Sequence, residues 1–231
     1  KFITLSFTFI VCFSSYIYGT FKINTNQALL NYLNQDNKIF TKIVSPNFEL
    51  VYDTQISEIE TKIKKLIKIS EPDSNKETLF VWPEGVFAGY NLEQISELGF
   101  LIEKSFNKNH YILFGINTFN EDRSAYFNSL VIVDNKLNVL KKYNKIKLVP
   151  FGEFLPFENF LNKFGIKKIT EGHGSFLKGK TQENIILENM NILPLICYEV
   201  IFTDLIQKSN SDTNLIINIS EDGWFGDSIG P

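Results

Sequence analysis

The chain has 231 residues, of which 44% are hydrophobic and 21% are charged, enough for one globular domain with an appendage. Its formal net charge of −3 argues against nucleic acid as a partner, because nucleic-acid-binding proteins usually carry a strong basic excess. The two cysteines, Cys12 and Cys197, lie far apart, in an apolar N-terminal run and after an apolar strand-like run. A disulfide framework is therefore not expected.

The first feature along the chain is an uncharged run from Phe2 to Phe21. As an α-helix, a run of this length rises by about 30 Å, the thickness of a bilayer core. Aromatic residues near its end, Tyr16 and Tyr18, are typical of a membrane interface. We predict a transmembrane helix over residues 1–21. A signal peptide is the alternative, but the chain lacks an initiator Met and a clear small-x-small cleavage site.

The rest of the chain alternates between strand-like and helical patterns. Residues 22–42 are rich in Asn, Gln and Lys and suit a juxtamembrane connector, and a globular domain is expected over residues 43–231. Apolar residues at helical spacing predict helices over 54–70 and 92–102, with a short helix after Glu199. Apolar runs predict strands at 78–82, 111–116, 129–133, 139–143, 191–197 and 215–219. This alternation is typical of an α/β domain in which helices cover a sheet.

Three short motifs follow strand-like runs and supply a carboxylate, a cation and a thiol. Glu84 follows Trp82-Pro83, where a carboxylate can accept a proton and where burial would raise its pKa. Lys145 lies among other lysines, and Cys197 precedes a probable helix start, where backbone amides would lower the pKa of the thiol. Such a set can perform acyl transfer through the cysteine. Singly, the three residues also fit a loop carboxylate, a solvated basic strand and a small buried cysteine.

The wording of these motifs resembles a known family. They read VWPEG at 81–85, YNKIKLVPFGE at 143–153 and LICYE at 195–199, in an order that resembles the nitrilase, or carbon-nitrogen hydrolase, superfamily. Two further stretches, PFGEFLP at 150–156 and DGWFGDSIGP at 222–231, narrow the resemblance to the apolipoprotein N-acyltransferases. These are membrane enzymes that complete bacterial lipoproteins.

The resemblance implies an α/β fold, a nitrilase-like αββα sandwich that is incomplete at its C-terminus and preceded by one transmembrane helix. It also implies that the sequence is a fragment truncated at both ends. The catalytic triad that it implies consists of Glu84 as the base, Lys145 as the cation that stabilises the oxyanion, and Cys197 as the nucleophile.

Further residues match supporting positions of the family. The resemblance implies an acyl-chain pocket lined by Trp224 and Phe225, and supporting roles for Glu153, Tyr198 and Glu199. At Lys147 the family usually has His, so this chain departs from the pattern there. Apart from the resemblance, the carboxylates also fit surface salt bridges, and the two aromatic residues also fit a hydrophobic core.

The implied activity is transfer of an acyl chain from a phospholipid, through a thioester on Cys197, to the N-terminal amine of a lipid-modified apolipoprotein. The expected partners are thus a phospholipid donor, an apolipoprotein acceptor and the membrane. The resemblance implies a multi-pass protein of the bacterial inner membrane with its catalytic domain on the periplasmic side. No cofactor is expected, and no metal, because two His and two scattered Cys do not form the usual zinc sets.

Three alternatives stay open. An amidase or nitrilase would use the same triad to hydrolyse a carbon–nitrogen bond, with water as the second substrate. A catalytically silent domain would only bind lipid or lipoprotein. A Cys-His protease dyad would need His110 or His173, and neither lies in a protease signature.

Overall fold

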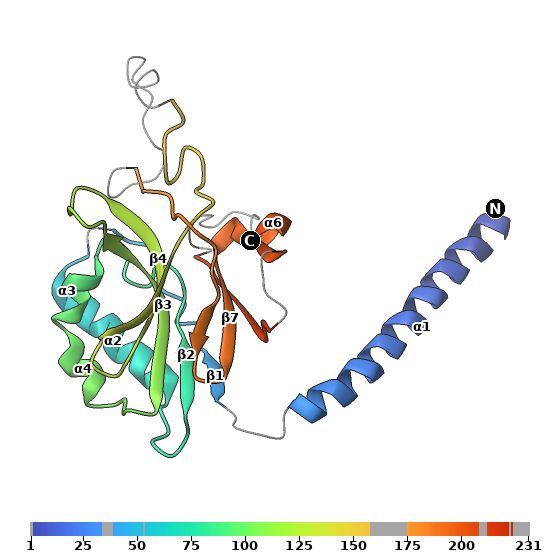
Figure 1. Cartoon of the computed structure of the whole chain (residues 1–231), viewed down its shortest axis with the longest axis horizontal. Helices are drawn as coiled ribbons and strands as arrows, with labels where there is room; N and C mark the ends of the chain where they lie inside the picture. The colour runs from blue at the N-terminus through green and yellow to red at the C-terminus, as the bar shows by residue number, and fades with distance from the viewer. Residues whose placement is uncertain are drawn as a thin grey trace. The chain divides into compact units, whose positions relative to one another are not determined.

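The computed structural model describes residues 2–33, 39–52, 54–157, 175–207, 212–221 and 223 (Figure 1). The chain divides into two compact units, Lys1–Lys38 and Ile39–Pro231. The second unit begins before the expected start of the globular domain at residue 43, because strand β1 (Phe40–Ile43) already belongs to it.

The first unit contains one continuous helix, α1 (Phe2–Leu33), which includes the predicted span and continues into the predicted connector. Hydroxyl side chains along this helix donate hydrogen bonds to carbonyl groups of the preceding turn, at Thr8, Ser14, Ser15, Thr20 and Thr25. Among the helices that the structure describes, none combines the length and the apolar character needed to cross a membrane.

The second unit is built on a five-stranded sheet with the strand order β1-β2-β3-β4-β5. After β1 its strands are β2 (Thr78–Val81), β3 (His110–Phe119), β4 (Tyr126–Val133) and β5 (Val139–Asn144). The first three strands are parallel, and β4 pairs antiparallel with both of its neighbours. β2, β5 and β3 therefore run in one direction and end at the same edge of the sheet.

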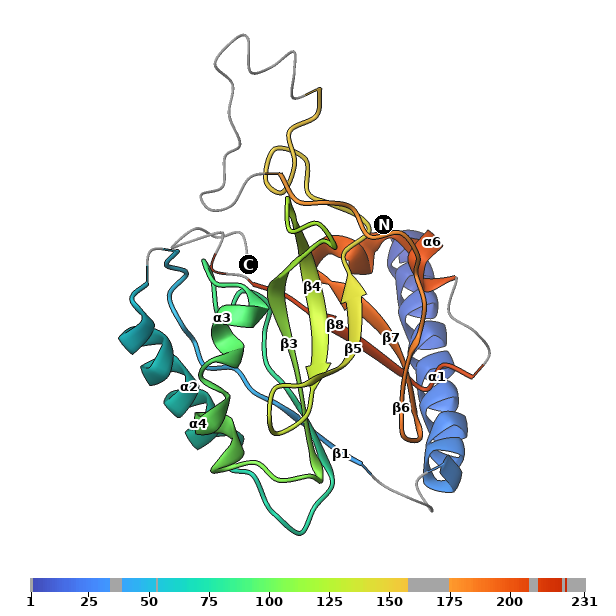
Figure 2. The same cartoon turned by 60° about the vertical axis from the view of Figure 1, so that its left-hand side comes forward.

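Three helices cover one face of this sheet: α2 (Ile56–Ser70), α3 (Leu92–Ser96) and α4 (Gly99–Glu103) (Figure 2). Strand residues alternate between the two faces, so Phe80 and Trp82 belong to the core under the helices. The helix predicted over 92–102 is interrupted at Leu98, which has a non-helical backbone. Its apolar spacing still serves the core, because Ile95 and Ile102 on either side of the break are buried.

The other face of the sheet packs on a second, three-stranded sheet with the order β6-β7-β8 (Figure 2). Its strands are β6 (Ile185–Leu187), β7 (Met190–Ile196) and β8 (Leu215–Ile219), and η2 (Cys197–Ile201) and α6 (Thr203–Ile206) follow β7. The layer of helices, the five-stranded sheet and the three-stranded sheet correspond to three of the four layers of the predicted αββα sandwich. After β7, the part of the chain that the structure describes contains only these two short helices.

Candidate active site

The side chains of Glu84, Lys145 and Glu153 meet in one buried cluster. Glu84 follows β2 and Lys145 follows β5, so two strands that end at the same edge of the sheet bring a carboxylate and a cation together. Lys145 Nζ lies 3.0 Å from Glu153 Oε1 and 3.6 Å from Glu84 Oε1. The structure thus places three of the predicted site residues in direct contact.

Asn128 on β4 belongs to the same cluster, although no motif indicated it. Its side-chain Nδ2 donates to Glu84 Oε1 and to Glu153 Oε1, both at 2.7 Å, as the two N–H groups of an amide allow. Its backbone carbonyl accepts from the N–H of Lys145 at 2.8 Å. Only its position in the strand could have indicated Asn128. Side chains alternate along β4, so Asn128 faces the same way as the buried Leu130, and it is a polar residue on an otherwise apolar face.

A missing side chain on β3 lets the backbone of Glu84 enter the space between the sheets. A Cβ on Gly115 would lie 2.8 Å from Glu84 Cα and 3.2 Å from Ile219 Cδ1. A real Cβ atom does not come within 2.8 Å of another carbon without a shift of one of the two, so this position favours glycine. Gly115 therefore sets how closely the backbone of Glu84 can approach β3.

The charges of Glu84 and Lys145, at the centre of the cluster, each stabilise the ionised form of the other group. Burial raises the pKa of Glu84, as the sequence predicts, while the charge of Lys145 and the Asn128 hydrogen bond act in the opposite direction. Burial alone would lower the pKa of Lys145, but the charges of Glu84 and Glu153 outweigh it and raise the pKa. Lys145 is therefore protonated and carries a positive charge at neutral pH. Glu84 Oε2 is buried and has no hydrogen-bond partner among the described residues, which leaves it able to accept a proton.

Cys197 stands at the sharp turn between β7 and η2. Its φ of 57° lies in the left-handed region, an uncommon conformation for a residue with a side chain that is often found at functional sites. The hydroxyl of Ser220, directly after β8, donates to Cys197 Sγ at 3.7 Å. The second sheet therefore contributes both the thiol and its hydrogen-bond donor.

The predicted direction of the thiol pKa is wrong. Burial and the negative charge of Glu84 raise the pKa of Cys197, and the opposing effects of Lys145, Ser220 and the backbone of Tyr198 do not reverse this. η2 has five residues, too few for the helix effect that the sequence suggested. The resting group is a thiol, and a base must remove its proton before it can attack.

Glu199 links the turn that carries Cys197 to the segment that carries Lys145. Its carboxylate accepts from the backbone N–H of Ile146 at 2.7 Å, of Lys147 at 2.9 Å and of Ile196 at 2.9 Å. The hydroxyl oxygen of Tyr143 lies 3.0 Å from each of the two carboxylate oxygens and 2.7 Å from Gln182 Oε1, and its single hydrogen is shared among these acceptors. Burial raises the pKa of Glu199, and this set of donors acts against it by favouring the ionised form.

Two neighbours of the catalytic candidates have clear contacts. The hydroxyl of Tyr198 donates to the carbonyl of Leu148 at 2.6 Å, and its ring centroid lies 5.7 Å from Lys145 Nζ. Lys147 stands where the family usually has His, and it pairs with Asp204 and not with Glu84 or Glu153. Its Nζ lies 2.9 Å from Asp204 Oδ2 and 4.9 Å from the ring centroid of Phe202. Lys147 therefore connects this segment to α6.

The remaining candidates are Trp224, Phe225, His173 and His110. Trp224, Phe225 and His173 lie outside the described residues. His110 is buried at the start of β3, where its Nδ1 accepts from Asn107 and its Nε2 lies 2.9 Å from the carbonyl of Asp73. Both ring nitrogens are engaged, so His110 is a structural residue and does not pair with Cys197.

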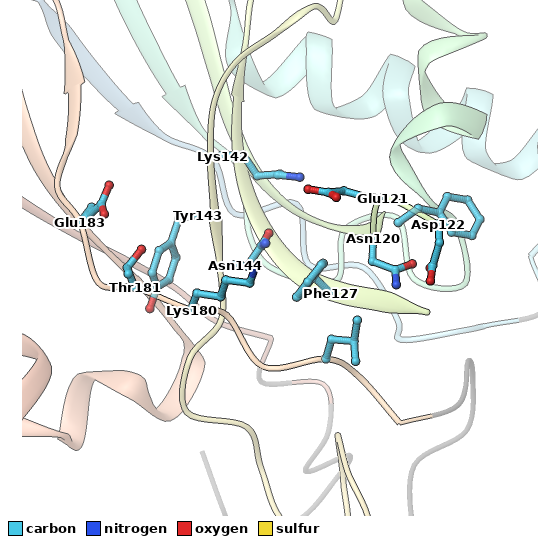
Figure 3. Close-up of a pocket in the computed structure, with 12 residues that line it drawn as sticks. Asn120, Glu121, Asp122, Phe127, Lys142, Tyr143, Asn144, Lys180, Thr181 and Glu183 are labelled. Carbon is cyan, nitrogen blue, oxygen red and sulfur yellow. The ribbon is translucent and has the colours of Figure 1, made fainter. Parts of the chain in front are cut away.

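A separate cavity of about 590 Å³ opens beside β5 (Figure 3). Charged and polar side chains from the β3–β4 turn, from β5 and from residues 177–183 line it, among them Glu121, Lys142 and Glu183. Glu84, Lys145 and Cys197 are not among its lining residues. Within the described part of the chain, no group of three or more His, Cys, Asp or Glu side chains is arranged to hold a metal ion.

Comparison with known proteins connects this geometry to a family. A family model described as carbon-nitrogen hydrolase matches residues 50–231. The chain is 31% identical over 224 residues to an apolipoprotein N-acyltransferase of Allorhizobium ampelinum, covering 93% of this chain and 41% of that protein. It is 35% identical over 190 residues to a protein of the same name from Wigglesworthia glossinidia brevipalpis, covering 76% and 36%. The chain thus spans less than half the length of these relatives.

Among solved structures, the chain is similar to a carbon-nitrogen hydrolase from Helicobacter pylori G27. The TM-score is 0.52 at 14% sequence identity, and the match covers 79% of this chain and 59% of that one. At this identity the likeness concerns the fold, and it agrees with a nitrilase-like arrangement of two packed sheets.

Proposed function

The chain belongs to the carbon-nitrogen hydrolase family, and from this premise we propose that it is an N-acyltransferase that matures lipoproteins. It moves an acyl chain from a phospholipid, through a thioester on Cys197, to the N-terminal amine of a lipid-modified apolipoprotein. The names and sequence identity of its relatives support this choice over hydrolysis of a carbon–nitrogen bond.

The observation that carries the proposal is the pairing of a buried cation with a carboxylate that has one open oxygen. Lys145 is held by Glu84 and Glu153, and Glu84 Oε2 has no donor among the described residues. Acyl transfer through a neutral thiol needs a base for the proton of the thiol and a positive charge for the oxyanion. In this proposal Glu84 is the base, Lys145 stabilises the oxyanion, and Cys197 is the nucleophile.

In the first half-reaction, Glu84 removes the proton of Cys197 and the sulfur attacks the ester carbonyl of the phospholipid. Lys145 stabilises the negative oxygen of the tetrahedral intermediate. The intermediate then loses the glycerol oxygen, which takes the proton from Glu84 and leaves as a lysophospholipid. The acyl chain stays on Cys197 as a thioester.

In the second half-reaction, the free amine of the apolipoprotein attacks the thioester carbonyl, and Glu84 accepts a proton from the nitrogen. The carbon–sulfur bond breaks, the proton passes to the sulfur, and an amide is released. Glu153, Tyr198 and Glu199 have supporting roles in this scheme, since they hold Lys145 and the segment around it. Trp224 and Phe225 are proposed to line the acyl-chain pocket.

We assign the reaction to the periplasmic side of the bacterial inner membrane in a multi-pass protein, with α1 at the membrane although it falls short of the apolar character of a typical span. Large apolar side chains of α1 such as Phe7, Phe9 and Ile10 are well exposed, which suits contact with lipid. Its hydroxyl groups bond within the helix, which lowers the cost of placing them in hydrocarbon. Confinement to the membrane would raise the effective concentration of both lipid substrates.

The deciding experiment is intact-mass spectrometry of the full protein after incubation with vesicles of phosphatidylethanolamine and phosphatidylglycerol, without acceptor. We expect an added acyl mass on the wild type that maps to Cys197, is removed by hydroxylamine and is absent from Cys197→Ser. Absence of the adduct, together with release of ammonia from small amides, would instead identify a carbon-nitrogen hydrolase. Absence of both would identify a silent binding domain.

A further inference from the structure

Glu221 is a carboxylate at the candidate site to which neither the motifs nor the proposed mechanism assigns a role. It follows Ser220, the donor to Cys197 Sγ, and its side chain lies against the backbone of Gly85. A Cβ on Gly85, whose φ is 66°, would lie 3.0 Å from Glu221 Oε2. The carboxylate of Glu221 therefore packs on the residue that directly follows Glu84.

The other carboxylate oxygen of Glu221, Oε1, is held by a hydrogen bond from its own loop. Glu221 Oε1 accepts from the N–H of Gly223 at 2.8 Å, and a Cβ on Gly223 would lie 2.7 Å from the same oxygen. Glycines on both sides of the carboxylate thus allow it to lie close to two backbone segments. The carboxylate of Glu221 is partly exposed and lies next to Gly85, the residue that follows Glu84.

The charges around Glu221 favour the binding of a cation. Glu84, Glu153 and Glu221 supply three carboxylates, and Lys145 is the buried cation, already shared between two of them. Lys62 on α2 interacts with the charge of Glu221 from the rim, where it also lies 5.6 Å from the ring centroid of Phe48. The negative charge of Glu221 also acts on the Glu84 carboxylate, so the two groups belong to one electrostatic site.

An independent observation points to a ligand here. Glu84 is 7% exposed, and its Oε2 atom has no hydrogen-bond donor among the described residues. A buried carboxylate oxygen without a donor is costly, and a substrate that brings N–H groups removes this cost. A primary ammonium carries three N–H donors and a positive charge, which match two carboxylates at once.

We propose that Glu221 and Glu84 together bind the N-terminal ammonium group of the acceptor polypeptide, with Glu221 as the residue that selects an amine over water. This inference rests on the proposed function and names the recognition element of its second half-reaction. Glu221 holds the ammonium beside the thioester, and one proton leaves to solvent. The amine then attacks the thioester carbon, its second proton moves through Glu84 to the departing sulfur of Cys197, and the amide forms as the carbon–sulfur bond breaks.

The inference separates the two substrates. The phospholipid ester presents no ammonium at the reacting carbonyl, so removal of the Glu221 charge should act on acylation of Cys197 only through the pKa of Glu84, which it lowers. The acceptor depends on the charge, and so removal of the charge should weaken acceptor binding and leave more of the thioester to water. A residue that only stabilised the loop would affect both half-reactions.

The test uses the full protein and the variants Glu221→Gln and Glu221→Asp, with Glu183→Gln as the matched control, because Glu183 is an exposed carboxylate away from Glu84. Acyl-enzyme formation from phosphatidylglycerol vesicles, whose head group carries no ammonium, is followed by intact mass. Transfer is followed with a synthetic peptide that begins with a diacylglyceryl-cysteine.

At a pH above the acid limb, where Glu84 is ionised in both proteins, we expect Glu221→Gln to form the acyl-enzyme at the wild-type rate and to show a KM for the peptide raised by about tenfold, with more thioester hydrolysis. Glu221→Asp should recover part of the loss, and Glu183→Gln should match the wild type. An unchanged KM in Glu221→Gln, or an equal loss in both half-reactions, would overturn the inference. A wild type that forms no acyl-enzyme would overturn the proposed function instead, so the two failures are distinguishable.

Discussion

The carboxylate of Glu199 fixes the backbone around Lys145 without touching the lysine side chain. It accepts from the N–H groups of Ile146 and Lys147, which follow Lys145 directly, and from the N–H of Ile196, which precedes Cys197. One buried carboxylate therefore joins the end of β5 to the end of β7. The distance between the proposed cation and the proposed nucleophile depends on this link between the two sheets.

Replacement of Glu199 by Gln should lower both activity and stability. The amide of Gln offers one acceptor oxygen where the carboxylate has two, and its N–H groups face the backbone N–H groups of Ile146, Lys147 or Ile196, so at least one backbone N–H loses its partner. We expect the free energy of unfolding to fall by about 3 kcal/mol and acyl-enzyme formation to fall at least about tenfold. Thermal unfolding and intact-mass kinetics measure the two effects. Glu97→Gln, at an exposed position, is the control that should change neither.

Asn128 should determine the acid limit of the reaction. Glu84 acts as a base only when ionised, and because burial raises its pKa, the acid limb of the rate profile should lie above the ordinary range of a glutamate. The Asn128 hydrogen bond lowers this pKa, so Asn128→Ala should raise it further and move the acid limb to higher pH. The pH dependence of acyl-enzyme formation measures the shift, and an acid limb that stays in place would contradict the role given to Asn128.

Much of the second unit follows from local patterns, and the exceptions have physical reasons. β2 and most of β4 are buried apolar runs, and β8 is an apolar run that buries Ile217 and Ile219, so run-length signals predict all three. β1 has largely exposed side chains, and β6 has only three residues, although all three are apolar. Neither is long enough to be recognised by its own pattern, and the pairing with a neighbouring strand makes them strands.

The same distinction applies to the site. The motifs point to Glu84, Lys145 and Cys197, because each follows a strand and carries a reactive group. Asn128 and Gly115 lie within strands, and their importance arises only when the pairing of β2, β3 and β4 in one sheet brings them against Glu84. The pKa direction of the thiol was likewise beyond the local pattern, because burial and the charge of Glu84 come from distant parts of the chain.

Gly115→Ala should disturb the site through packing alone. The added Cβ would lie 2.8 Å from Glu84 Cα, so Glu84 must move away from β3. We expect a loss of about 1–3 kcal/mol in the free energy of unfolding and slower acyl-enzyme formation. Gly19→Ala is the matched control, because no atom lies within 4 Å of its added Cβ and alanine favours a helix. Equal unfolding temperatures for the two variants would argue against a tight fit at Gly115.

Reactivity of the thiol and activity of the enzyme should separate in the charge variants. Burial raises the pKa of Cys197, the charge of Glu84 raises it further, and the charge of Lys145 lowers it. Glu84→Gln should therefore lower the thiol pKa, and Lys145→Met should raise it. The rate of alkylation by iodoacetamide against pH reports this directly, in a Cys12→Ser background because Cys12 is also an exposed free cysteine.

The two variants should then differ in a way that identifies the base. Glu84→Gln should be alkylated faster than the wild type at neutral pH and yet form no acyl-enzyme, because the nucleophile is easier to ionise but the leaving glycerol oxygen has no acid to protonate it. Lys145→Met should be slow in both reactions, since it loses the charge that favours the thiolate and the oxyanion. A Glu84→Gln variant that is slower in alkylation would show that Glu84 ionises the resting thiol, against the direction given by its charge.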